Sequence, residues 1–148
     1  RRDLRAHDHA ALYHALKHAR EVFVAFVFDT DILADLPPDD RRVSFIHASL
    51  HDLHRQMQAL KPDAGLLVSH GAARQTIPEL ARALRVDAVF TNHDVEPQAK
   101  ARDAQVLGAL AHHDIVMHSF KDQSIFERDE VLTQSGRPYT VFTPYNKA

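Results

Sequence analysis

The chain has 148 residues, of which 45% are hydrophobic, and this is enough for one domain with a hydrophobic core. Its formal net charge is -2, so the composition does not favour a surface that holds a nucleic-acid backbone by itself. The absence of cysteine excludes disulfide bonds, thiolate metal sites and cysteine nucleophiles, and it indicates a cytoplasmic protein. No apolar run predicts a membrane span, and the 12 histidines lack the spacing of a ligand motif, so no metal site is predicted.

The first half of the chain predicts two helices and a strand. Asp8 is expected to cap a helix that runs to about Arg20. The β-branched and aromatic run from Val22 to Phe28 predicts a strand buried on both faces, as in a parallel sheet. After a polar loop, Asp39 or Asp40 is expected to start a long helix. Apolar residues at three- and four-residue steps form its expected buried stripe: Val43, Ile46, Leu50, Leu53 and Met57.

The second half repeats strand and helix. Short apolar runs predict strands at residues 66–68, 88–91 and 115–117. A helix is expected from about Gln75, and Pro97 is well placed to open another, because proline fits the first helical turn. This alternation predicts an α/β fold with three layers, a Rossmann-like parallel sheet with helices on both faces.

Charged side chains gather where two of the predicted strands end. Asp29 follows one strand, and Asp94 and Glu96 follow another, at the sheet edge where open α/β proteins bind ligands. These carboxylates could accept hydrogen bonds from a bound ring, or they could cap helices and compensate helix dipoles, worth about 0.3–1 kcal/mol. Arginines in nearby loops and apolar neighbours would complete a mixed pocket, although ion pairs within the protein are the structural alternative. The candidate residues are Arg2, Phe28, Asp29, Ile32, Arg42, Asp94 and Glu96.

Common catalytic and nucleotide-binding motifs are missing from the sequence. It contains no GxGxxG, no P-loop lysine motif and no GxSxG nucleophile elbow. Ser69-His70 follows a predicted strand without an evident third member of a triad. No catalytic residue is therefore predicted within these 148 residues.

Three stretches, in the same order, resemble signatures of the DNA photolyase and cryptochrome family. Residues 1–8 (RRDLRAHD) resemble the opening RRDLRxxDN signature, with His9 in place of its asparagine. Residues 92–103 resemble the N-x-D-x-EP-x(4)-RD stretch. Residues 136–145 resemble the G-x-PY-x-VFTPF segment that leads into the interdomain linker, with Tyr145 for phenylalanine.

The resemblance implies the N-terminal α/β domain of a photolyase, which carries the light-harvesting antenna chromophore. Residues 1–133 would form this domain and residues 134–148 the start of the linker. The family's first strand, which precedes the RRDLR signature, is not among these 148 residues and is expected in the protein. The helical domain that holds FAD and binds damaged DNA would also lie outside this sequence, so these residues alone are expected to be inactive.

The resemblance also implies an antenna type. Members that bind a deazaflavin or flavin antenna look similar at Arg2, Asp29, Arg42, Asp94 and Glu96. Members that bind methenyltetrahydrofolate typically carry an Asn-Glu pair where this chain has glutamine and alanine, at positions 98 and 99. Deazaflavin or FMN is therefore favoured over folate, and an empty site is the alternative.

The implied function is that of an antenna domain in a light-driven deoxyribodipyrimidine photo-lyase, which repairs cyclobutane pyrimidine dimers. Its implied partners are its own C-terminal helical FAD domain and, only through that domain, damaged DNA. No membrane and no metal are expected. The alternatives are the same domain of a cryptochrome photoreceptor and a stand-alone flavin- or nucleotide-binding module.

Overall fold

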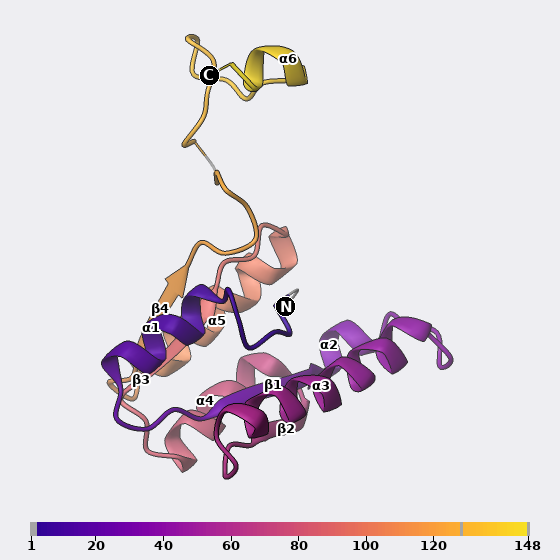
Figure 1. Cartoon of the computed structure of the whole chain (residues 1–148), viewed down its shortest axis with the longest axis vertical. Helices are drawn as coiled ribbons and strands as arrows, with labels where there is room; N and C mark the ends of the chain where they lie inside the picture. The colour runs from indigo at the N-terminus through magenta and orange to yellow at the C-terminus, as the bar shows by residue number, and fades with distance from the viewer. Residues whose placement is uncertain (1–2, 128, 148) are drawn as a thin grey trace.

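Two pairs of parallel strands form the centre of the molecule (Figure 1), whose computed structural model describes residues 3–127 and 129–147. Strand β1 (Val24–Asp29) pairs with β2 (Leu66–Gly71), and β3 (Ala88–Asn92) pairs with β4 (Val116–Phe120). Each connection between paired strands contains a long helix, as parallel pairing requires. The predicted α/β class with parallel strands and packed helices is confirmed.

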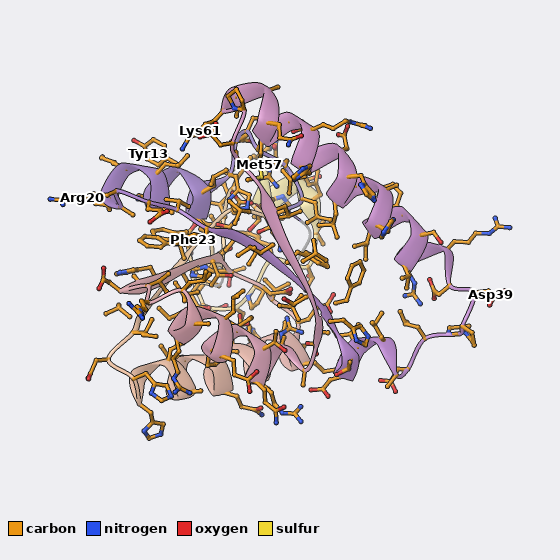
Figure 2. All side chains as sticks on the ribbon, turned by 90° about the horizontal axis from the view of Figure 1, so that it is seen from below. Tyr13, Arg20, Phe23, Asp39, Met57 and Lys61 are labelled. Atoms are coloured by element: carbon orange, nitrogen blue, oxygen red, sulfur yellow. The ribbon has the colours of Figure 1, made fainter. Side chains whose placement is uncertain are left out.

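Helices connect and cover the strands. They are α1 (Ala10–His18), α2 (Thr30–Leu33), α3 (Arg41–Leu60), α4 (Ala73–Ala83), α5 (Pro97–Ala111) and α6 (Phe142–Tyr145). Helix α1 packs on β3 and β4, α3 on β2, and α4 on β1 and β2. Helices α4 and α5 pack against each other and so join the two halves of the molecule. Figure 2 shows α3 running from Lys61 towards Asp39, which lies at the outer end of the loop after α2.

The two strand pairs are separate sheets in the part of the chain that the structure describes. Each of β1 and β3 has one hydrogen-bonded neighbour, so each keeps one open backbone edge. The expectation that residues 22–28 form a strand buried on both faces is wrong here, because Phe23 and Ala25 are exposed and the other five residues are only half-buried. Val68 on the paired strand β2 is also exposed, at 52%.

The hydrophobic core lies where α4 and α5 meet β3 and β4. Its fully buried members come from the helices and from the residue before β4: Ala81, Val106, Leu110 and Ile115. Half-buried apolar residues surround them: Ile77, Val86, Val89 and Met117. This core fixes α5, whose first turn lies next to the predicted ligand edge.

Local sequence signals placed most helix starts correctly. Asp40 caps α3 and Pro97 opens α5, as predicted. The expected cap of α1 by Asp8 is wrong, because His9 occupies the cap and its Nδ1 accepts from the backbone N–H of Leu12. Asp8 instead has a left-handed backbone with φ of 48°, and its carbonyl oxygen accepts from the Arg5 guanidinium. Helix α2 was not predicted.

After residues 122–127 contact the body of the molecule, the chain leads away from it to α6 (Figure 1). Val141 and Phe142 are exposed there, with Phe142 at 72%. Within residues 3–127 and 129–147, no helix combines the length and the apolarity needed to cross a membrane.

Candidate functional site

Asp29, the last residue of β1, is buried at 6% exposure. Its Oδ1 accepts from the backbone N–H of Asp31 at 3.2 Å and of Ala73 at 3.1 Å, which ties β1 to the starts of α2 and α4. Its Oδ2 is buried and accepts no hydrogen bond from the described residues. A buried carboxylate oxygen without a donor is costly, so this oxygen is the clearest unused acceptor at the predicted edge.

Arg102 reaches Asp29 from α5. Its Nη1 lies 3.5 Å from Asp29 Oδ2, close enough for an ion pair although no hydrogen bond forms. The contact crosses from one strand pair to the other and compensates part of the buried charge. Sequence reasoning assigned Arg102 no role, although it belongs to the Arg-Asp end of the stretch at residues 92–103.

Asp94 and Glu96 lie on the loop between β3 and α5. Asp94 Oδ1 accepts from the backbone N–H of Glu96 at 3.1 Å, just before the helix begins. Glu96 has an extended backbone at the cap position of α5, and its side chain is exposed. Asp94 therefore closes a turn just before the helix, and its side chain does not cap α5, whose N-cap is Glu96.

Arg42 lies in the first turn of α3 and pairs with Asp40. Its Nη2 lies 2.6 Å from Asp40 Oδ2, and Nε donates to Oδ1 at 2.9 Å. Hydrogen bonds from the side chain and the backbone of Arg42 lower the pKa of Asp40 to about 2, and the same pair raises the pKa of Arg42. The arginine is exposed, and the structural ion pair is the role that is seen.

The apolar candidates lie on both sides of Asp29. Phe28 is half-buried and packs edge-on against Phe26, with ring centroids 5.1 Å apart. Ile32, on α2, is 49% exposed. Arg2 lies outside the described residues.

Among the described candidates, Asp29 ends β1 and Asp94 and Glu96 follow β3, and none lines an observed hollow. One hollow of about 360 Å³ is lined by polar residues after β3 and β4: His93, Lys121, Glu127, Asp129 and Glu130. A second of about 360 Å³ is lined by Ala81, Arg82, Arg85, Val86, His113 and Ile115. Neither is lined by a described candidate, and only Asp29 among them keeps a buried acceptor unused.

Asn92, which sequence reasoning did not single out by itself, is the most buried polar side chain described, at 1% exposure. Its Oδ1 accepts from the backbone N–H of Ala11 at 2.9 Å, and its Nδ2 donates to Asp3 Oδ2 at 2.9 Å. An asparagine that ends an apolar strand was the available signal. It fixes the charged segment before α1 against the carboxyl end of β3.

Asp122 makes a matching contact after β4. Its Oδ1 accepts from the backbone N–H of Ala10 at 2.8 Å, and its Oδ2 pairs with Arg5 Nη2 at 2.8 Å. The start of α1 is thus held by polar groups that follow two neighbouring strands. Asp3 and Arg5, from the stretch that resembles the RRDLR signature, therefore lie at the carboxyl ends of β3 and β4.

Comparison with known proteins places this arrangement in context. The family model described as DNA photolyase matches residues 1–148. A deoxyribodipyrimidine photo-lyase of Synechococcus sp. (PCC 6301) is 35% identical over 149 residues, which is 99% of this chain and 30% of the relative.

Two crystal structures show the same fold. A class III photolyase from Agrobacterium tumefaciens matches with a TM-score of 0.81 and 27% identity, covering 97% of this chain and 29% of that one. An archaeal photolyase from Sulfolobus tokodaii matches with a TM-score of 0.74 and 27% identity, covering 87% of this chain and 31% of that one. That structure contains two FAD molecules and is described as implying a novel light-harvesting cofactor. The chain spans about 30% of the length of these relatives.

Proposed function

The chain belongs to the DNA photolyase family, and from this premise we propose that it is the N-terminal domain that binds a light-harvesting antenna chromophore. The parent protein would be a light-driven deoxyribodipyrimidine photo-lyase. The antenna would absorb light and pass the excitation energy to FAD in a separate helical domain, and damaged DNA would bind through that domain.

The observation that carries the proposal is the unused Oδ2 of Asp29. It is buried at the carboxyl end of β1, and Arg102 offers charge at 3.5 Å but no hydrogen bond. A ring N–H or a hydroxyl group of a ligand would supply the missing donor. Leaving such an acceptor without a donor costs about 1–3 kcal/mol, so a ligand that satisfies it gains affinity.

The other candidates would complete the site from three neighbouring segments. Asp94 and Glu96 would accept hydrogen bonds from the polar rim of the chromophore, and Arg42 would exchange part of its ion pair with Asp40 for a ligand oxygen. Phe28 and Ile32 would supply apolar contacts to a flat ring. Arg2 would lie on the same edge. The mixed apolar and polar character of this set supports the assignment.

The antenna would be a deazaflavin or FMN and not a folate. Ala99 is 4% exposed and carries no polar group, and its neighbour is Gln98. The pterin donor groups of a folate would therefore meet no carboxylate at position 99. An unsatisfied donor costs about 1–3 kcal/mol, which favours flavin-type rings.

Titration of the protein with FMN, a deazaflavin and methenyltetrahydrofolate tests this function. We expect the first two to bind more tightly than the folate. Asp29→Asn turns the buried acceptor into a donor with little change of shape, and it should cost about 1–3 kcal/mol, or about 5- to 150-fold in Kd. Glu96→Ala should also weaken binding, whereas Asp63→Asn, an exposed carboxylate at the other end of β2, should not. Preferential folate binding, or equal binding by the Asp29 variant, would overturn the assignment.

We also propose a domain organisation for the parent protein. The open edges of β1 and β3 could both be paired by one intervening strand, which would join the two sheets into one. A strand that precedes residue 1 would fit this place. Residues 134–148 would begin the linker to the helical domain, which is supported by the exposed Val141 and Phe142. The antenna domain alone should not bind dimer-containing DNA, and a salt-sensitive affinity near the micromolar range would contradict this division.

A further inference from the structure

His93, the residue after β3, is held by three different groups from one later segment. Its backbone N–H donates to the carbonyl oxygen of Phe120 at 2.7 Å. Its carbonyl oxygen accepts from Gln123 Nε2 at 3.3 Å. Its ring Nδ1 lies 2.6 Å from Glu127 Oε2, which is the closest of the three contacts. Backbone and side chain of His93 are therefore both fixed by residues 120–127.

Glu127 is an acidic side chain with 9% exposure, so its partner matters. An ionised carboxylate only accepts hydrogen bonds, so His93 Nδ1 is the donor whenever Glu127 is ionised. The backbone N–H of Glu127 donates to Glu130 Oε2 at 3.1 Å, and Glu130 pairs with Lys121 Nζ at 2.7 Å. The Lys121 hydrogen bond, followed by the Glu127 N–H, lowers the pKa of Glu130, which keeps this ion pair charged. The segment is thus closed on itself in a form that presents Glu127 to His93.

The pair lies one residue from the loop that carries the proposed ligand acceptors. Asp94 follows His93 directly, and Asp94 Oδ1 holds the backbone N–H of Glu96 at 3.1 Å. Fixed contacts therefore run from Glu127 through His93 to Asp94 and Glu96. We propose that His93 and Glu127 are positioning residues, which hold Asp94 and Glu96 in the geometry that binds the antenna. This inference rests on the proposed function.

If the His93–Glu127 pair served only to stabilise the fold, its variants would behave differently from those of a pair that positions the loop. Removing one partner leaves a buried charge or donor and destabilises any fold, whereas replacing both partners with apolar side chains is often neutral. If the pair served only stability, the double replacement would restore ligand binding together with stability. If the pair positions the loop, the double replacement restores stability but not affinity.

The experiment compares FMN affinity and urea stability in one set of variants. His93→Asn keeps a donor near the position of Nδ1, and Glu127→Gln keeps an acceptor, so both should bind FMN nearly as the wild type does. His93→Phe and His93→Phe/Glu127→Leu remove the hydrogen bond, and they should raise the Kd for FMN by roughly 3- to 30-fold. His112→Phe, an exposed histidine at the end of α5, is the matched control and should change nothing.

The outcomes separate this inference from the proposed function. If the wild type does not bind FMN or the deazaflavin, or if Asp29→Asn binds equally well, the proposed function fails. If Asp29→Asn loses affinity but the folded double variant binds FMN as tightly as the wild type, the positioning role is wrong. Gln123→Ala removes an anchor of His93 without leaving a buried charge, and it should weaken FMN binding even if His93→Phe does not fold. Unchanged affinity in Gln123→Ala and the double variant would refute the inference.

Discussion

Gly71 ends β2, two residues before α4, and the structure leaves no room there for a side chain. A Cβ built on Gly71 would lie 2.7 Å from Thr76 Oγ1, well inside van der Waals contact. Overpacking of this kind costs about 1–3 kcal/mol. Against it stands the gain of about 0.5–1 kcal/mol that alanine has over glycine in a strand. We therefore expect Gly71→Ala to lower the free energy of unfolding by about 1 kcal/mol, within a range of about 0–2.5 kcal/mol.

Urea unfolding followed by circular dichroism measures this difference. Gly65→Ala is the matched control, because nothing lies within 4 Å of its added Cβ, and it should be neutral or slightly stabilising. Thr76→Ala in the Gly71→Ala background removes the clashing oxygen and should recover most of the loss. A Gly71→Ala variant as stable as Gly65→Ala would show that Thr76 moves away freely, and that the start of α4 is not held as tightly as described.

Three further predictions concern the elements around the site. Arg42 lowers the pKa of Asp40 from 3.8 to about 2, so the ionised Asp40 stabilises α3 above about pH 4, and this stabilisation is lost as the pH falls through 2. In carboxyl NMR titrations, Arg42→Gln should raise the pKa of Asp40 towards 3.8. An unchanged pKa would contradict Arg42 as the cause of the shift. Arg85 has φ of 54° after α4, so Arg85→Gly should raise the free energy of unfolding by about 0.5–1 kcal/mol, whereas Arg82→Gly inside the helix should lower it by about 1 kcal/mol. Asn92→Ala leaves the buried backbone N–H of Ala11 without its acceptor and should lower the free energy of unfolding in urea by about 2–4 kcal/mol. A decrease below about 0.5 kcal/mol would mean that water replaces the side chain.

Local chemistry explains which features of the fold could be predicted. Asp40 and Pro97 mark their helix starts because a cap or a fixed φ angle acts within one turn of the chain. Asp8 carries the same local signal as Asp40, yet His9 takes the cap, because Arg5 binds the Asp8 carbonyl and turns its backbone. Short-range signals compete where a segment is rich in polar side chains.

The contacts at the site depend on residues distant in sequence, and this limited their prediction. Asp29 was correctly placed at a strand end, but its partner Arg102 comes from a helix 73 positions later, and no local pattern selects that pairing. Arg42 was expected at the ligand edge, and its observed partner is Asp40, two residues away. The separation of the sheet into two pairs does not follow from the apolar runs, because these define strands but not which strands are neighbours.

The open edges of β1 and β3 have a consequence for handling this chain. Unpaired backbone N–H and C=O groups at a strand edge are templates for other chains, and natural proteins usually protect them. Residues 22–28 next to such an edge are rich in aromatic and β-branched side chains and carry no charge, a composition typical of segments that aggregate. At high concentration the open strand edges of different chains will therefore pair with one another. The yield of monomer will fall as the protein concentration during refolding rises.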